Sequence, residues 1–237
     1  MLIDTGHFRT IHLSESDRLP ADKSALIIVD MSNRFCDPVW LSKNIPTGET
    51  QQERGKWFAL ELPVVIEGAK VALDAFRSVH AMVVHVITGR LTTEGRELVP
   101  YMRERDYDLA DTEAMSVIES LAPLIGEVLI RKPASSSFTG TGLDYLLHNA
   151  GIEHIVLAGQ FGDACVFYTL IQSREYGFKN YWLEDSVLYQ TRSLKNVMPP
   201  LIGSRWAKLT NAGQLDSAFG RDLVGIETGR PQATDSR

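Results

Sequence analysis

Short apolar runs recur along this chain and restrict its fold more than any other feature. They lie at residues 25–30, 81–87, 127–130, 154–159 and 180–184, and a sixth strand is expected near 206–210. Runs of this length are typical of strands buried on both faces of a parallel sheet. Segments with helical patterning separate them, at 64–79, 111–125, 142–150 and 164–176. The alternation predicts right-handed βαβ units and an α/β fold with a mainly parallel sheet.

The remaining segments fit one domain. A length of 237 residues suits a single large α/β domain, and no repeat or interdomain linker interrupts it, so we predict one domain over 1–237. We expect an irregular arm at 1–22 and a flexible polar tail at 227–237. The stretch 36–62 breaks the alternation with proline, glycine and aromatic residues. Long loops in compact domains are usually functional or disordered, so we interpret 36–62 as a cap-like loop, with surface packing as an equal alternative.

Composition excludes several function classes. With 44% hydrophobic and 23% charged residues the chain can build a sizeable core. The net charge of -6 gives no basic face for a nucleic acid. No apolar run approaches the roughly 18 residues of a membrane helix, and the first residues lack a secretion signal. We therefore expect a cytoplasmic protein with no nucleic-acid or membrane partner, whose two cysteines are reduced thiols.

Three chemically useful residues follow predicted strands. Asp30 ends the first apolar run, Lys132 follows the third, and Cys165 follows the fourth at the start of a helix. Ligands of parallel α/β sheets bind at the carboxyl ends of the strands, so these side chains are expected to converge. Taken singly, the aspartate could cap a turn, the lysine could be solvated and the cysteine could be a buried apolar residue.

Together the three residues have a coherent chemistry. A helix N-terminus and a nearby ammonium favour the thiolate, which is the reactive form of cysteine. A carboxylate beside the thiol can accept its proton and later deliver it to a leaving amine. Backbone N–H groups in the turn before Cys165 can hold a developing oxyanion. The pattern indicates a cysteine-dependent hydrolase.

Four segments resemble the isochorismatase-like cysteine hydrolase superfamily, which includes nicotinamidases, N-carbamoylsarcosine amidohydrolase and ureidoacrylate amidohydrolase. The segments are ALIIVDMSNRFCDP, RKPASSSFTGTGLDYLL, GIEHIVLAGQFGDACVFYT and YWLEDS, and the resemblance covers about residues 24–210. It implies a doubly wound α/β fold with helices on both faces of the sheet. It also implies a catalytic triad of Asp30, Lys132 and Cys165.

The resemblance further implies a cis peptide bond between Gln160 and Phe161, with the amides of Phe161 and Cys165 as the oxyanion hole. The chain departs from the family pattern at this turn. Gln160 stands where an aliphatic residue is common, Phe161 replaces a small residue, and Gly162 replaces threonine or asparagine. Arg34 stands in place of an aspartate of the opening motif. The first three departures bear on the shape of the oxyanion turn, and Arg34 is either a positive charge near the substrate or a solvated side chain.

The segments expected around the active site also indicate whether a metal binds and which residues contact the substrate. The nicotinamidases of this superfamily bind a metal through histidines that follow the second strand, and here no histidine follows His85 in that region, so we predict no metal and no other cofactor. His85 itself is interpreted as a core or edge residue. Candidate substrate-binding residues are Arg34, Phe35, Trp57 and Phe138. Basic residues in the expected loops are compatible with a substrate that carries a carboxylate, and the alternative is that they are simply solvated.

The sequence as a whole predicts hydrolysis of a C–N bond in a small amide, ureido or N-carbamoyl compound through a thioester. One alternative is isochorismatase-type cleavage of a vinyl ether, which needs the aspartate and lysine but no thiol, so Cys165 argues against it. A second alternative is a non-catalytic binding protein that retains the fold. The family resemblance also implies a homo-oligomer, a dimer or tetramer, and the apolar residues of 166–171 are a candidate interface.

Overall fold

Six parallel strands form the centre of the protein in a computed structural model that describes residues 10–14, 17–105, 109–110 and 112–220. Their order across the sheet is β3-β2-β1-β4-β5-β6. Their bounds are Ser24–Val29 for β1, Met82–Thr88 for β2, Val128–Lys132 for β3, His154–Gln160 for β4, Lys179–Leu188 for β5 and Lys208–Thr210 for β6. Every residue of β1 and β4 is buried, as expected for central strands covered on both faces.

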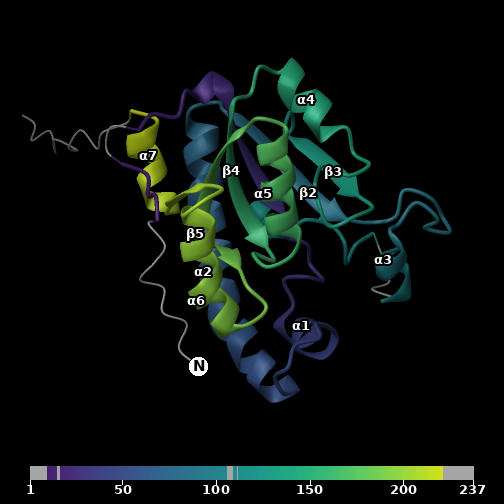
Figure 1. Cartoon of the computed structure of the whole chain (residues 1–237). Helices are drawn as coiled ribbons and strands as arrows, with labels where there is room; N and C mark the ends of the chain where they lie inside the picture. The colour runs from purple at the N-terminus through teal and green to yellow at the C-terminus, as the bar shows by residue number, and fades with distance from the viewer. Residues whose placement is uncertain (1–9, 15–16, 106–108, 111, 221–237) are drawn as a thin grey trace, which may run out of the picture.

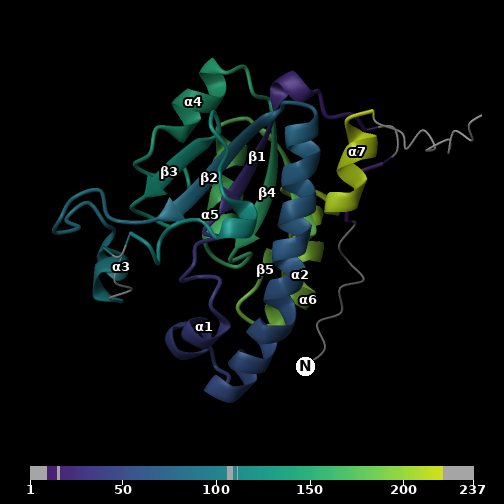
Figure 2. The same cartoon turned by 180° about the vertical axis from the view of Figure 1, so that it is seen from behind.

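Helices cover both faces of this sheet, so the predicted doubly wound α/β fold is confirmed (Figures 1 and 2). The α-helices are α1 (Pro38–Asn44), α2 (Gln51–Ser78), α3 (Pro100–Glu104), α4 (Leu143–Asn149), α5 (Cys165–Glu175), α6 (Arg192–Gly203) and α7 (Leu215–Ala218). Short 3-10 helices lie at Ala21–Lys23, Glu119–Leu121 and Ala212–Gln214. One core lies under α2 and α7, and the other lies under α4, α5 and α6. No helix of the described residues is long and apolar enough to cross a membrane.

The strand order reverses between β1 and β4, and this point decides where the site lies. The two strands pair in parallel from Ser24↔His154 to Val29↔Gly159. From β1 the chain runs outward through β2 and β3, then returns to β4 and runs outward on the other side. The loops that leave β1 and β4 therefore diverge and open a crevice at the carboxyl edge of the sheet.

The stretch 36–62 is not the loop that its prolines and glycine predicted. It forms α1 and the first part of α2. Asp37 caps α1 and accepts a hydrogen bond from the Val39 amide, and Pro38 occupies the first helical position, where the missing N–H costs nothing. The prolines of this stretch therefore lie at the start of α1 and in the connection between α1 and α2, with Pro63 as the next proline inside α2.

Residues 112–121 do not form the predicted helix either, apart from the 3-10 turn at Glu119–Leu121. The segment runs beside the chain that leaves β1, with a bridge between Ser32 and Val117 and a hydrogen bond from the Ile118 amide to the Met31 carbonyl. Its apolar residues still reach the core, since Met115 and Leu121 are fully buried. The apolar residues of this segment are therefore buried without an α-helix, and their spacing does not reflect one. Residue 111 lies outside the described residues.

The two ends of the chain were assigned as an arm and a tail. The described part of the arm packs on the fold, because Leu13 donates a backbone hydrogen bond to Leu209 and Leu19 is buried. Residues 1–9 and the tail at 227–237 lie outside the described residues. The described part of the arm is therefore held against β6.

The capping box at the start of α2 gives a stability prediction. The Thr50 hydroxyl accepts from the Glu53 amide, and the Glu53 carboxylate accepts from the Thr50 amide at 2.8 Å. We expect Thr50→Ala to lower the free energy of unfolding by about 1 kcal/mol, because the Glu53 amide loses its acceptor and the Glu53 carboxylate loses the hydroxyl that donates to it. Thr50→Ser keeps the capping oxygen and should stay near wild type. Urea denaturation of the two variants measures the difference, and equal stability of both would contradict the prediction.

Candidate active site

Asp30 is the first residue beyond β1 and is held in an unusual backbone conformation. Its φ is 56°, in the left-handed region that residues other than glycine seldom adopt. Its amide donates to the Val86 carbonyl at 2.7 Å, so the turn is tied to β2. The amide of Thr88 donates to Asp30 Oδ1 at 2.6 Å, and the Thr88 hydroxyl lies 2.9 Å from the same oxygen. The carboxylate is 3% exposed and fixed in place.

Lys132 is the last residue of β3 and is fully buried. Its Nζ lies 2.8 Å from Asp30 Oδ2, 2.6 Å from Thr88 Oγ1, 3.1 Å from the Ala134 carbonyl and 3.3 Å from Cys165 Sγ. Burial disfavours the ammonium, but the Asp30 carboxylate and Cys165 outweigh it and raise the pKa of Lys132 above its ordinary value. Lys132 therefore stays charged and pairs with Asp30 beside the thiol.

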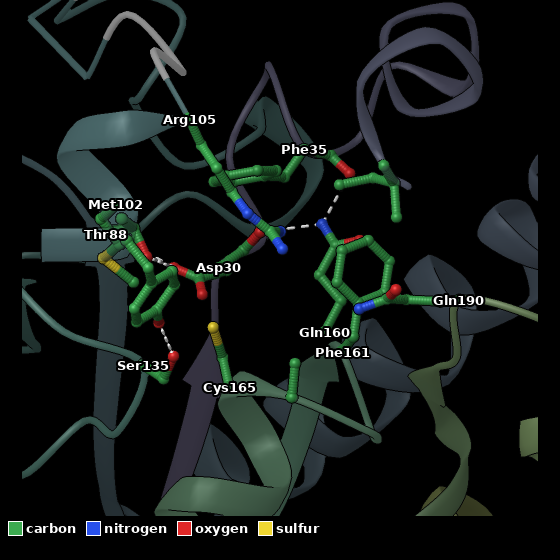
Figure 3. A pocket seen from close by; sticks show the side chains of 13 residues that line it. Asp30, Phe35, Thr88, Met102, Arg105, Ser135, Gln160, Phe161, Cys165 and Gln190 are labelled. Atoms are coloured by element: carbon green, nitrogen blue, oxygen red, sulfur yellow. Dashed lines mark hydrogen bonds between the residues drawn. The ribbon is translucent and has the colours of Figure 1, made fainter. Parts of the chain in front are cut away.

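Cys165 is the first residue of α5 and lies within reach of both partners. Burial raises the pKa of its thiol to about 12; the Lys132 ammonium lowers it, and the hydrogen-bonded Asp30 raises it further. In the unliganded site the desolvation thus outweighs the effect of the ammonium. The thiol holds its proton next to a carboxylate that can accept it, and Figure 3 shows the sulfur pointing toward Asp30.

The turn between β4 and α5 brings backbone amides beside the sulfur. The peptide bond between Gln160 and Phe161 is cis, at the bond that the family resemblance named. The Phe161 carbonyl accepts from the amides of Ala164 and Val166, which closes the turn. The first amides of a helix have no intrahelical acceptor, and Cys165 is such a residue. The amides of Phe161 and Cys165 thus both belong to the turn that leads from β4 into α5.

Gly162 replaces the usual polar residue of this turn for a steric reason. A Cβ at this position would lie 2.4 Å from Cε1 of Tyr189 and 2.7 Å from Cγ1 of Val187. The Gly162 amide also donates to the Leu188 carbonyl at 2.7 Å. The turn is therefore packed closely against the end of β5, and only glycine fits there without displacing its neighbours.

A cavity of about 80 Å³ lies over the sulfur. Its lining residues come from the ends of β1, β2 and β4, from α3 and from the loops beside them (Figure 3). They are Asp30, Phe35, Ile45, Thr88, Tyr101, Met102, Arg105, Ser135, Gln160, Phe161, Ala164, Cys165 and Gln190. Tyr101, Arg105, Ser135, Ala164 and Gln190 also line a larger groove of about 910 Å³ over α5. The enclosed cavity thus adjoins an open groove on the surface.

Of the four expected substrate-binding residues, only Phe35 lines this cavity. Arg34 instead lies over the ring of Trp40, with 5.9 Å from its guanidinium carbon to the ring centre. Trp57 belongs to α2 and donates from its indole N–H to the Tyr189 carbonyl at 2.8 Å. Phe138 is buried in the core under α4 and α5. Trp57 and Phe138 were candidates because they are aromatic, and in the structure both side chains have packing roles.

The sequence reasoning missed Thr88, Tyr101 of α3 and Arg105, which directly follows α3. Thr88 is the last residue of β2, at a position similar to that of Asp30 directly after β1. The apolar run at 81–87 stops one residue before it, so the polar side chain at the end of this strand was not singled out. The hydroxyl of Tyr101 contacts that of Ser135. The Arg105 guanidinium lies 5.9 Å from the ring centre of Tyr101 and reaches into the cavity from the end of α3 (Figure 3). A helix of five residues in a long connection left no clear pattern.

His85 has a structural environment. It is 1% exposed, and its Nε2 lies 3.2 Å from Oε2 of Glu127, which also pairs with Arg77 at 2.7 Å. Burial lowers the pKa of this histidine. Among the described residues no group of three or more histidine, cysteine or acidic side chains could hold a metal ion. His85 therefore packs in an ion-paired cluster away from the sulfur.

The comparison with family models decides the family. The isochorismatase domain model matches residues 24–195, from the first residue of β1 into α6. The chain belongs to the isochorismatase family. Its fold and the arrangement of Asp30, Lys132 and Cys165 at the reversal of strand order agree with this membership. The protein is accordingly an isochorismatase-family hydrolase.

Two amidohydrolases resemble this family member over short stretches. Maleamate amidohydrolase from Pseudomonas putida is 33% identical over 69 residues, which cover 29% of the chain and 32% of that protein. Ureidoacrylate amidohydrolase from Serratia proteamaculans is 40% identical over 65 residues, covering 27% of the chain and 23% of that protein. The chain thus aligns with about a third or less of these two relatives.

The solved structures extend the likeness to the whole fold. A cysteine hydrolase from Pseudomonas syringae pv. phaseolicola 1448A superimposes with a TM-score of 0.72 at 18% identity. The match covers 91% of this chain and all of the other one. At that identity the comparison concerns the fold, which it confirms.

Proposed function

We propose that this isochorismatase-family hydrolase cleaves a C–N bond of a small amide, ureido or N-carbamoyl compound through a thioester at Cys165. The observation that carries the proposal is the grouping of a thiol, a carboxylate and an ammonium in one buried site, with Lys132 Nζ 3.3 Å from the sulfur and 2.8 Å from Asp30. The names of the two amidohydrolase relatives support the bond type.

The first half of the reaction forms the thioester. Asp30 accepts the Cys165 proton as the sulfur attacks the carbonyl carbon of the substrate, so that a thiolate forms only during attack. The carbonyl oxygen becomes an oxyanion, which the amides of Phe161 and Cys165 stabilise. Protonated Asp30 then donates the proton to the leaving nitrogen, the C–N bond breaks, and a thioester and a free amine or ammonia result.

The second half returns the enzyme to its starting state. Asp30, ionised again, accepts a proton from a water molecule that attacks the thioester carbon. The same amides hold the second oxyanion. When the C–S bond breaks, the sulfur recovers the proton from Asp30 and the acid product leaves. Lys132 keeps its proton throughout and stabilises the carboxylate whenever Asp30 is ionised.

The cavity supports a small substrate with an anionic group. The enclosed part holds about 80 Å³, enough for a carboxamide or carbamoyl group, and Phe35, Phe161 and Met102 give it apolar walls. Arg105 lines both this cavity and the adjoining groove. A guanidinium in that place can bind a carboxylate through two parallel hydrogen bonds. The carboxylate site inferred from the sequence is therefore proposed at Arg105.

Two other functions use the same fold. Vinyl ether cleavage needs no nucleophilic sulfur, and the position of Cys165 between Asp30 and Lys132 favours the amidase. A binding protein without activity needs no buried ion pair at its cavity. A screen of small amides and ureides, including maleamate and ureidoacrylate, with detection of released ammonia tests the proposal. Release of ammonia from at least one compound is expected, and none from any of them would contradict it.

The oligomeric state remains a prediction of the family resemblance. Val166 and Leu170 of the candidate interface are fully buried in the core under α5, so they are not available for contact. Tyr168 on the same helix is 58% exposed and lines the groove over α5. A dimer or tetramer is expected by light scattering, and a monomer at micromolar concentration would contradict it.

The ion pair between Lys132 and Asp30 predicts a change in pH dependence. An ammonium near a carboxylate favours its ionised form, which is the form that accepts the thiol proton. In Lys132→Met this partner is lost, so kcat/KM should fall and the acidic limb of its pH profile should shift. The control is Arg131→Met. Arg131 precedes Lys132 on β3 and its side chain lies on the opposite face of the sheet, so the pH profile of this variant should match that of the wild type. An unshifted limb in Lys132→Met would contradict the assigned role.

A further inference from the structure

The Gln160 amide is fixed in one orientation at the wall of the cavity. Its Nε2 donates to the backbone carbonyl of Asp30 at 2.9 Å and to that of Phe35 at 2.6 Å (Figure 3). Both partners are acceptors only, so the nitrogen must face them and the amide cannot be flipped. Both N–H bonds of the amide are thus used, and Oε1 lies on the other side of the group.

Oε1 is the atom without a partner. Gln160 is 1% exposed, and its Oε1 is buried with no hydrogen-bond donor among the described residues. A buried acceptor that lacks a donor is unfavourable, and such atoms are rare in folded proteins. Gln160 also lines the cavity over Cys165. Oε1 is itself closed to solvent, and the cavity is the space beside Gln160 from which a bound substrate can bring a donor to it.

We infer that Gln160 Oε1 accepts a hydrogen bond from the second N–H group of a ureido or N-carbamoyl substrate, the one on the side of the carbonyl that does not leave. This inference rests on the proposed function and narrows its substrate class. It assigns a specificity role to a position where the family commonly has an aliphatic residue.

The chemistry of the site indicates which N–H group this is. The leaving nitrogen must face Asp30, from which it takes its proton, and the carbonyl oxygen must face the amides of Phe161 and Cys165. The third substituent of the carbonyl carbon is left for the rest of the cavity lining, to which Gln160 and Phe35 belong. In a ureide this substituent is an N–H donor, whereas in a simple carboxamide it is a carbon that leaves Oε1 unpaired.

Two compounds differ in this one group. N-carbamoylglycine and succinamate share a terminal carboxamide nitrogen, a carboxylate and the same chain length, and the N–H of the first is a CH₂ in the second. Their dissociation constants can be measured by calorimetry on Cys165→Ser, which prevents turnover. We expect N-carbamoylglycine to bind about 10- to 100-fold more tightly, because only it satisfies Oε1.

The same pair is then measured on Cys165→Ser/Gln160→Met, where the preference should fall to less than about threefold. A merely structural role of Gln160 would weaken both ligands alike and leave their ratio unchanged. Equal binding of the two compounds to Cys165→Ser, binding of neither, or a preference that persists without Gln160 would overturn the inference. The comparison on Cys165→Ser alone decides the matter if the double variant does not fold.

Failure of the proposed function is seen separately in ammonia release by the wild-type enzyme. Hydrolysis of both compounds with equal binding would overturn the inference and leave the amidase intact. A binding preference without any hydrolysis would support the role of Gln160 and contradict the amidase.

Discussion

Cys165→Ser is expected to lower kcat/KM by at least about 10³-fold, because a serine hydroxyl is a far weaker nucleophile than cysteine at neutral pH. The substitution changes one atom at the N-terminus of α5 and should leave the fold unchanged. The rate of ammonia release, measured with the best compound of the amide and ureide screen, gives the loss. Circular dichroism confirms that the variant is folded.

Cys36 provides the matched control for this variant. It is the other cysteine of the chain, is partly buried like Cys165, and burial likewise raises the pKa of its thiol to about 12. It does not line the cavity over Cys165. Cys36→Ser should therefore keep kcat/KM within a few-fold of wild type. Comparable losses in the two variants would show that the sulfur of Cys165 has only a packing role.

Asp30→Asn is expected to reduce kcat/KM by about 10³-fold, within the usual contribution of a general base. The thiol of Cys165 holds its proton in the free site, so attack needs an acceptor at the moment of reaction. Asparagine tolerates the left-handed backbone that Asp30 adopts with φ 56°, and its side-chain oxygen can still accept from the Thr88 amide. The loss can then be assigned to the missing base.

The double variant Asp30→Asn/Cys165→Ser tests whether the two residues act in one step. We expect its activity to be barely lower than that of either single variant, because members of one catalytic unit are not additive. Losses that multiply would indicate independent roles. An Asp30→Asn enzyme with wild-type kcat/KM would remove the general base from the mechanism.

The sheet and the meeting of Asp30, Lys132 and Cys165 at one edge of it could be predicted from the sequence because both are consequences of local patterns. Apolar runs such as 25–30 and 154–159 can only be buried as central strands, and polar residues that follow them meet at one edge. The doubly wound topology and the Gln160–Phe161 bond came from the family resemblance. Asp30, Lys132 and Cys165 are within bonding reach of one another although they are far apart in the chain.

The walls of the cavity could not be predicted, since they depend on packing between distant segments. Arg105 enters the cavity from a five-residue helix whose position is set by the loop after β2, and no local signal fixes it. The raised pKa of the Cys165 thiol could not be predicted either. Helix terminus and ammonium were weighed from the sequence, but the burial that dominates the pKa of the thiol is a property of the folded site.

Mass spectrometry of the acid-quenched enzyme tests the central claim most directly. The account predicts that wild-type protein mixed with a hydrolysed amide or ureide and quenched during turnover carries the acyl group of the substrate on the peptide that contains Cys165. Cys165→Ser, treated in the same way, should carry no such thioester. A substrate that is hydrolysed without any acyl group on Cys165, at the same rate in Cys165→Ser as in wild type, would contradict the account.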